Sequence, residues 1–265
     1  MGDKMTLQIR KDAQMARDGF ILFPFPFDLA KAMKEHIFAF LGISSAGTMS
    51  EKEILKRATE KSLTYSDEEF TQKFAKPFRM FPDSVARIAL NWVESLREPF
   101  GGKKIGVNYV CAEERAKNSQ LREDSFDLFW RCVRPGKPDV GAAHCDYQFW
   151  EIAKGTPQEV GSSFNYDERW KIWVPLLGCD GTNSLQVVSG SHSMDVPTDR
   201  VLTKNGYKPV IQPHWLEKYE KSFHCPLTSF GSHCVLFHDK LVHRGPPNNS
   251  SNLRLSGEMT ILLKL

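Results

Sequence analysis

The chain has 265 residues, of which 41% are hydrophobic and 25% are charged, and this composition is typical of a globular protein with a buried core. A formal net charge of +3 is too small to indicate nucleic-acid binding, because such proteins usually carry a strongly basic surface. No apolar run approaches the roughly 18 residues that cross a bilayer, and the N-terminus lacks a secretory signal, so we expect a cytoplasmic protein without a membrane partner.

Two local patterns carry little weight. The six cysteines are scattered and none belongs to a C-x-x-C pair, which favours buried free thiols over a disulfide framework or a zinc ribbon. The first residues, MGDKMT, fit the N-myristoylation pattern at Gly2 and Thr6. Because that pattern is short and permissive, we do not expect the modification.

The first 103 residues are expected to be mainly helical. The segment FILFPF at 20–25 predicts a short strand, and residues 28–41 predict a helix. Ser50 is expected to cap a second helix, with Glu53 completing a capping box. A third helix begins at Asp83, and its predicted apolar face consists of Val85, Ile88, Ala89, Trp92 and Leu96. These helices should pack as a layer against the rest of the chain.

From about Lys104 the pattern changes to that of short strands rich in aromatic and β-branched residues. The segments are KIGVNYVCA, FDLFWRCV, AAHCDYQFW, WKIWVPLL, SLQVVS, HCVLFHDKLVH and LRLSGEMTILLKL. Such a series, with few helices between the strands, predicts an antiparallel sandwich or jelly roll. Residues 151–169 and 193–206 are predicted to be long loops, either lids over a site or plain surface excursions.

A candidate metal site begins in the stretch GAAHCDYQFW. If this stretch is a strand, His144 and Asp146 point to one face, roughly 7 Å apart at the backbone, and Cys145 points to the other. His243, at a strand end far along the chain, would complete the two histidines and one carboxylate of non-haem Fe(II) oxygenases. A zinc site could use the same side chains, so these residues do not identify the metal.

Arg254 follows His243 in the segment LRLSGEMT. On a strand it shares a face with Ser256, so a guanidinium and a hydroxyl could meet a carboxylate there. A 2-oxo acid that chelates iron needs such a partner for its far carboxylate. The alternative for Arg254 taken alone is a solvated basic residue.

Three motifs in this order resemble the phytanoyl-CoA dioxygenase family of Fe(II)/2-oxoglutarate oxygenases: HCD, WKIWVPLLGCDGTNSLQVVSGSH and FHDKLVHRGPPNNSSNLRLS. The resemblance covers roughly Gly141 to Leu263. It implies that iron is bound by His144, Asp146 and His243. It further implies a 2-oxoglutarate site formed by Arg254, which binds the C5 carboxylate, with Trp173 beside it and Ser256 as a weaker candidate. The chain departs from the family pattern at Asn183-Ser184 and Ser189-Gly190, both in turns.

The resemblance also implies the architecture and the reaction. The expected fold is mainly β, a cupin-like double-stranded β-helix (jelly roll) over 104–265 with a helical flank over 1–103, in one domain spanning 1–265. The expected enzyme uses Fe(II), 2-oxoglutarate and O2 to hydroxylate a small-molecule substrate and releases succinate and CO2. Because Asp146 is present, halogenation is disfavoured, whereas desaturation and ring closure stay open.

The substrate is the least determined feature of the sequence. We expect a small polar metabolite, with or without an anionic group, such as a sugar acid, an amino acid or a natural-product intermediate. Arg131 is a weak candidate for substrate binding, and Arg134 and Lys137 lie close to it in the chain. Asn108 and Tyr109 are weak candidates for contact with 2-oxoglutarate.

Two further histidines and two other protein classes are alternatives to this interpretation. His192 is expected to be structural, and His238 is a rival ligand whose spacing from His243 would place it on the opposite face of a continuous strand. The alternatives from other classes are a cupin-like metal enzyme that does not use 2-oxoglutarate and a non-catalytic jelly-roll binding module. The first would leave Arg254 unexplained, and the second predicts no tight metal binding and no oxygen chemistry.

Overall fold

The computed structural model describes residues 13–43, 48–96, 104–107, 128–153, 168–203 and 206–264. The helices are α2 (Phe27–Phe40), α3 (Glu51–Leu63), α4 (Asp67–Lys73), α5 (Asp83–Ser95), α7 (Asp146–Ala153) and α8 (Pro213–Tyr219), with short 3-10 turns at Lys76–Arg79, Ser191–Ser193 and Glu220–Ser222. The strands are β1 (Phe20–Pro24), β2 (Lys104–Val107), β3 (Leu128–Val133), β4 (Glu168–Leu177), β5 (Gln186–Val188), β6 (Thr198–Thr203), β7 (Gly206–Ile211), β8 (Phe223–His224), β9 (His233–His238), β10 (His243–Arg244) and β11 (Arg254–Lys264).

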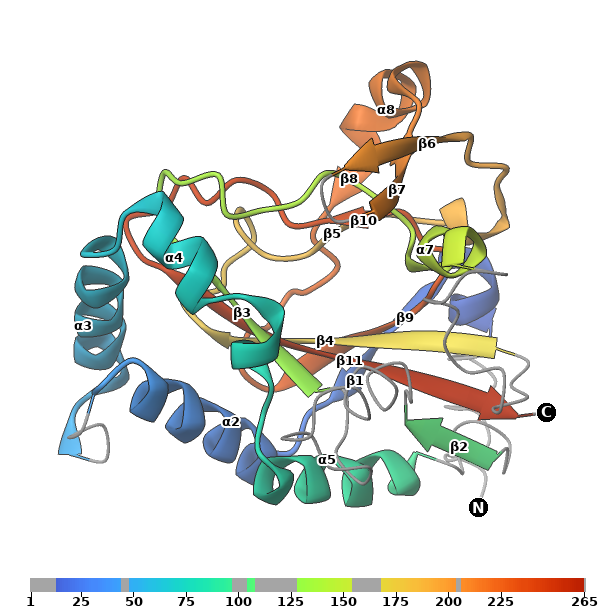
Figure 1. The fold of residues 1–265 in the computed structure, drawn as a ribbon. Helices are drawn as coiled ribbons and strands as arrows, with labels where there is room; N and C mark the ends of the chain where they lie inside the picture. The colour runs from blue at the N-terminus through green and yellow to red at the C-terminus, as the bar shows by residue number, and fades with distance from the viewer. Residues whose placement is uncertain are drawn as a thin grey trace.

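The strands form antiparallel sheets of unequal size. The large sheet has six strands in the order β1-β9-β4-β11-β2, with β3 also paired to β11, and the small sheet has the order β10-β5-β8. Strands β6 and β7 form a separate hairpin. Figure 1 shows the small sheet above the large one, and β11 running through the middle of the large sheet. The described part of the chain thus combines antiparallel sheets with N-terminal helices.

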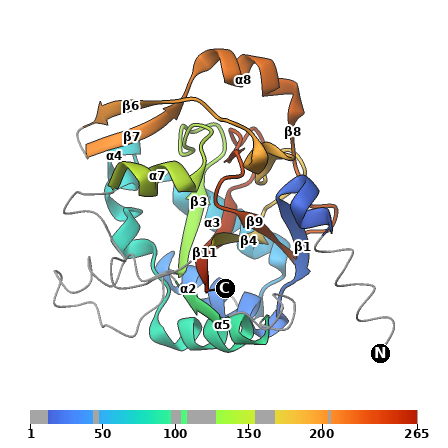
Figure 2. The same cartoon turned by 90° about the vertical axis from the view of Figure 1, so that its right-hand side faces the viewer.

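The large sheet is buried on both faces. On β4, Trp170, Ile172 and Val174 pack into an apolar cluster with the residues of α2, α3 and α5, which cover the lower face of the sheet in Figures 1 and 2. The alternate residue Trp173 packs against Val187 of the small sheet. The period of two in a strand therefore separates a helix-covered face from a face that looks toward the small sheet.

The predicted N-terminal elements agree with the structure. The strand at 20–25 is β1, which pairs with β9, and the expected helices are α2, α3 and α5. The Ser50 hydroxyl accepts a hydrogen bond from the backbone N–H of Glu53, as expected of a cap. On α5 one position is wrong: Ile88 is 37% exposed, while Val93 is buried. No helix in the described ranges is long and apolar enough to cross a membrane.

Three local predictions in the second half are wrong. The segment AAHCDYQFW is not a strand, because His144 forms only an isolated bridge and Asp146 begins α7, where a carboxylate is favourable beside the helix dipole. Residues 193–206 are not a long loop, since β6 lies within them. HCVLFHDKLVH is two strands separated by a turn. The loop prediction at 151–169 falls mostly outside the described residues, and so do Gly2, Asn108 and Tyr109.

Gly178, directly after β4, allows an unusually close approach of two chain segments. Its φ is +65°, and a Cβ atom there would lie 2.0 Å from the Leu253 carbonyl oxygen. We predict that Gly178→Ala lowers the free energy of unfolding far more than Gly136→Ala, which should cost about 1–2 kcal/mol. Gly136 is the matched control because it has the same φ and open space around its Cβ position. Equal losses in urea denaturation would contradict this packing.

Candidate active site

The two histidines at the centre of the site are joined through their backbones. The His144 N–H donates to the His243 carbonyl and the His243 N–H donates to the His144 carbonyl, both at 3.0 Å. This antiparallel bridge holds the two imidazole rings 4.4 Å apart between centroids. Asp146 follows as the first residue of α7. One donor atom from each of His144, Asp146 and His243 lies within 4.8 Å of the others, so these side chains can share one metal ion.

Both imidazoles present the same nitrogen to the shared space. His144 Nδ1 donates to the Ala142 carbonyl at 2.8 Å, and His243 Nδ1 donates to the Leu241 carbonyl at 2.9 Å. In the neutral ring, a proton on Nδ1 leaves Nε2 with a free lone pair. Phe149 contacts the His144 ring and Phe237 contacts the His243 ring, each near perpendicular or tilted, which restricts their rotation. Such outer contacts orient histidines for metal binding.

The electrostatics of the cluster favour a cation. Burial alone would raise the pKa of Asp146, but Lys171 and the two histidines outweigh it and lower that pKa. Burial, with His144 nearby, lowers the pKa of His243 to about 4, so its imidazole is neutral at pH 7. Asp146 Oδ2 is buried and has no hydrogen-bond partner. The Nε2 atoms of the two imidazoles and one carboxylate oxygen without a hydrogen-bond partner fit a divalent metal ion.

Arg254 lies at the start of β11 and lines the same cavity. The side chain is buried, Nη1 donates to the Asn183 carbonyl, and Nε has no hydrogen-bond partner. No acidic side chain of the described residues forms an ion pair with it. Gly245 makes room for the guanidinium, because a Cβ atom there would lie 2.8 Å from Arg254 Nη2. A buried cation without a counter-ion is costly, so the cavity fits a ligand with a carboxylate.

The cavity of about 90 Å³ lies between the two sheets and has a charged wall. Trp173 lines it, whereas Ser256 is buried but is not among the lining residues. Arg131 lines it and forms an ion pair with Glu258 at 3.0 Å. Burial alone would raise the pKa of Glu258, but Arg131 and Lys171 outweigh it and hold that pKa far below its ordinary value. Glu258 therefore stays ionised at pH 7.

Four residues of the site were missed by the sequence interpretation. Lys171 stands two positions before Trp173, and Glu258 stands four after Arg254, so the strand period of two would have indicated both. Asn183 and Asn248 are buried and shape the turns around the site, Asn183 by presenting its carbonyl to Arg254 and Asn248 by donating to Val133 at 3.0 Å. Only their turn context hinted at such roles.

The remaining candidates have structural contacts. Arg134 is buried and pairs with Asp139 at 2.8 Å, and Lys137 pairs with Asp67 at 3.0 Å, so neither faces the metal cluster. His192 and His238 contact each other, with ring centroids 5.8 Å apart. Neither belongs to the metal-ligating cluster found among the described residues.

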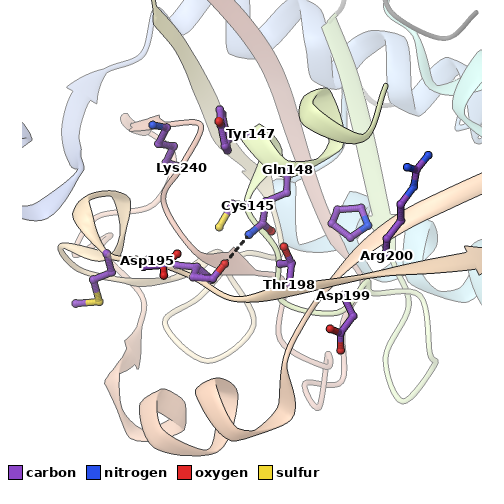
Figure 3. Close-up of a pocket in the computed structure, with 11 residues that line it drawn as sticks. Cys145, Tyr147, Gln148, Asp195, Thr198, Asp199, Arg200 and Lys240 are labelled. Atoms are coloured by element: carbon purple, nitrogen blue, oxygen red, sulfur yellow. Dashed lines mark hydrogen bonds between the residues drawn. The ribbon is translucent and has the colours of Figure 1, made fainter. Parts of the chain in front are cut away.

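A second cavity lies on the other side of the His144–Asp146 segment. It has a volume of about 470 Å³ and includes Cys145, Gln148, Arg200 and Lys240 in its lining. Figure 3 shows Gln148 of α7 beside Thr198 and Arg200 of β6, while Lys240 lies farther away, beyond Tyr147. Cys145 therefore points away from the metal cluster, as expected, although the segment is not a strand. The two cavities share no lining residue among those described.

The model of the phytanoyl-CoA dioxygenase (PhyH) family matches residues 28–256. Curated protein sequences give no match. A similar fold occurs in the non-heme monooxygenase ThoJ in its apo form, with 15% identity, a TM-score of 0.51, and coverage of 95% of this chain and 76% of that one.

Two further solved structures are similar with lower scores. EctD from S. alaskensis, solved with 2-oxoglutarate and 5-hydroxyectoine, has 15% identity and a TM-score of 0.49, and the match covers 96% of this chain and 75% of that one. The alpha-ketoglutarate-dependent epimerase SnoN from nogalamycin biosynthesis has 14% identity and a TM-score of 0.45, with coverage of 97% and 84%.

The low pKa of His243 predicts how the stability of the metal-free protein depends on pH. Between about 4 and the ordinary value of 6.5, the unfolded chain binds more protons than the folded protein. The free energy of unfolding should therefore rise with pH through this window, by on the order of 1–3 kcal/mol. Urea denaturation of wild type and His243→Gln measures this rise. We expect a shallower slope in the variant, and an unchanged slope would contradict the assignment.

Proposed function

Because the chain belongs to the phytanoyl-CoA dioxygenase family, and is thus a non-haem iron oxygenase dependent on 2-oxoglutarate, we propose that His144, Asp146 and His243 bind the iron. The observation that carries this proposal is the cluster of one donor atom from each residue within 4.8 Å. The orientation of both histidines by their Nδ1 hydrogen bonds supports it. Family membership sets aside a non-catalytic binding module and a metal enzyme that does not use 2-oxoglutarate.

Arg254 is the residue that binds the C5 carboxylate of 2-oxoglutarate in this proposal. Its guanidinium is buried, lacks an acidic partner in the described chain, and keeps Nε free for a bond to a ligand. Trp173 lines the cavity and limits the space beside the cosubstrate. Ser256 does not line the cavity and has the weaker support. When bound, iron and 2-oxoglutarate supply the activation of O2 that oxidises a substrate C–H bond, with release of succinate and CO2.

The protein side chains have separate tasks in this scheme. His144 and His243 supply nitrogen donors, and Asp146 supplies the anionic oxygen donor that also occupies the position a halide would need. The aromatic rings of Phe149 and Phe237 fix the imidazoles, and the inter-sheet position of the cavity limits access of water. We propose hydroxylation of a small polar metabolite, such as a sugar acid, an amino acid or a natural-product intermediate, with Arg131 as a weak candidate for contact with it.

We further propose that the two sheets are the halves of a double-stranded β-helix within one domain spanning residues 1–265. The position of the metal cluster between a large and a small antiparallel sheet supports this arrangement. Strand β1 pairs with β9, so the mainly helical flank contributes a strand to the large sheet. The described cysteines are free thiols, which suits the reducing cytoplasm.

The proposed function predicts a spectroscopic test. Under anaerobic conditions, addition of Fe(II) and then 2-oxoglutarate should give wild type the weak visible absorption band of the iron chelate. His144→Ala should lose the band. Arg254→Ala should need at least about tenfold more 2-oxoglutarate, because charged hydrogen bonds contribute about 1.5–3 kcal/mol. Arg57→Ala, on the exposed face of α3, is the matched control. A folded wild type without the band would refute the proposal.

Gly245 provides a second test of the Arg254 assignment. In Gly245→Ala the new Cβ would press on Arg254 Nη2, so the guanidinium must shift and 2-oxoglutarate should bind several-fold more weakly. Gly141→Ala is the control, since Gly141 also lines the cavity but its Cβ position meets nothing within 4 Å. Calorimetric titration of both variants measures the effect. Equal affinities would contradict the assignment.

A further inference from the structure

Lys171 is a cation in the metal cavity to which the proposed chemistry gives no task. It projects from β4 into the space between the sheets, and its side chain is 16% exposed. Its Nζ lies 3.8 Å from Asp146 Oδ2, which is too long for a hydrogen bond. Within the described ranges, no acceptor lies within hydrogen-bond distance of this ammonium group. Its three donors are therefore available to a ligand.

The other charges around Lys171 are already paired. Arg131 pairs with Glu258 at 3.0 Å, and Asp139, which also lines the cavity, pairs with Arg134 at 2.8 Å. Two opposite charges lie near Lys171: Asp146, at 3.8 Å, and Glu258, whose carboxylate is hydrogen-bonded to Arg131. Once Asp146 binds a metal ion, its negative charge is shared with that ion. Lys171 is then a mostly buried cation without a hydrogen-bonded counter-ion among the described residues, which is costly.

The sum of the charges in a cavity that holds the metal ion and 2-oxoglutarate indicates that one negative charge is missing. The two positive charges of a divalent metal ion balance the two negative charges of the carboxylates of 2-oxoglutarate. The positive charge of Arg254 and the negative charge of Asp146 balance as well. The opposite charges of Arg131 and Glu258, which form an ion pair, also balance. Lys171 is the one positive charge left over among these lining residues. An anion with one negative charge, bound next to the metal, would neutralise it.

Resting on the proposed function, we propose that Lys171 binds a carboxylate of the primary substrate and that the enzyme oxidises a small organic acid. The distance between Lys171 and Asp146 places this carboxylate beside the metal, so the oxidised carbon lies near the acid group of the substrate. Trp173 and Phe237 line the adjoining wall and offer apolar contact to the carbon skeleton. Two other tasks for Lys171 compete with this one: orienting Asp146, and binding the C1 carboxylate of 2-oxoglutarate.

The test uses the full chain loaded with Fe(II) and 2-oxoglutarate under argon. The probes are short-chain monocarboxylates from acetate to hexanoate and the corresponding neutral amides, titrated by calorimetry. Lys171→Met removes the charge and keeps the length of the side chain, and Lys171→Arg keeps the charge. Lys240→Met is the matched control, because Lys240 lies in the second cavity over the Tyr147 ring.

The expected result has three parts. Wild type binds at least one acid more tightly than its amide, Lys171→Met loses that preference by about tenfold or more, and Lys171→Arg and Lys240→Met keep most of it. Lys171→Met retains the iron chelate band and the 2-oxoglutarate affinity of wild type. A band lost in Lys171→Met would instead indicate that Lys171 orients Asp146, and would overturn the proposal.

Three further outcomes would also overturn it. If wild type binds no acid better than its amide, or if Lys171→Met binds acids as well as wild type does, Lys171 is not a substrate site. If Lys171→Met binds 2-oxoglutarate about tenfold more weakly, the anion at Lys171 belongs to the cosubstrate. A wild type without the chelate band would refute the proposed function itself, independently of any acid titration.

Discussion

The pair of backbone hydrogen bonds between His144 and His243 is the interaction on which the site depends. It joins two segments about a hundred residues apart at 3.0 Å in both directions, so the backbones that carry the two imidazoles are held side by side. The bridge also fixes where α7 begins, and Asp146 is its first residue. A cluster of three donors thus results from one short antiparallel contact rather than from long strands.

The large sheet supplies the other half of the site through the alternation of its side chains. On β4 and β11 one set of side chains packs against the helices. The alternate set, which includes Lys171, Trp173, Arg254 and Glu258, faces the small sheet. This polar inner face is buried, and each charge on it needs a partner. Arg131 pairs with Glu258, whereas Arg254 has no acidic partner among the described residues and Lys171 has Asp146 at 3.8 Å. The charges that line the cavity therefore favour anionic ligands.

The structure brings together three residues that the sequence interpretation had grouped, although their predicted local structure was wrong. The spacing of His144 and Asp146 indicated a shared direction, and the structure brings them together with His243, but through a bridge and a helix start instead of a strand. Strand propensity in the aromatic stretch after Asp146 was overridden by tertiary context, which propensity cannot represent. The β6–β7 hairpin was missed although an Asn-Gly pair at 205–206 is a common hairpin signal.

Other features could not be found without three-dimensional contacts. The Asn183 carbonyl meets Arg254 across the turn after β4, and Lys171 approaches Asp146 from a different element. Ser256 shares the alternation of Arg254 and Glu258, yet it is buried and does not line the cavity. Alternation alone gives the face of a strand on which a side chain lies, and it does not say which side chains of that face reach a cavity.

The central claim is that one metal ion is held by these three side chains between the sheets. Anomalous X-ray diffraction from crystals of the full chain grown anaerobically with Fe(II) tests it most directly. We expect a single strong iron peak within bonding distance of His144 Nε2, His243 Nε2 and an Asp146 carboxylate oxygen. A peak bound to other residues, or no peak at this cluster in well-diffracting crystals, would contradict it.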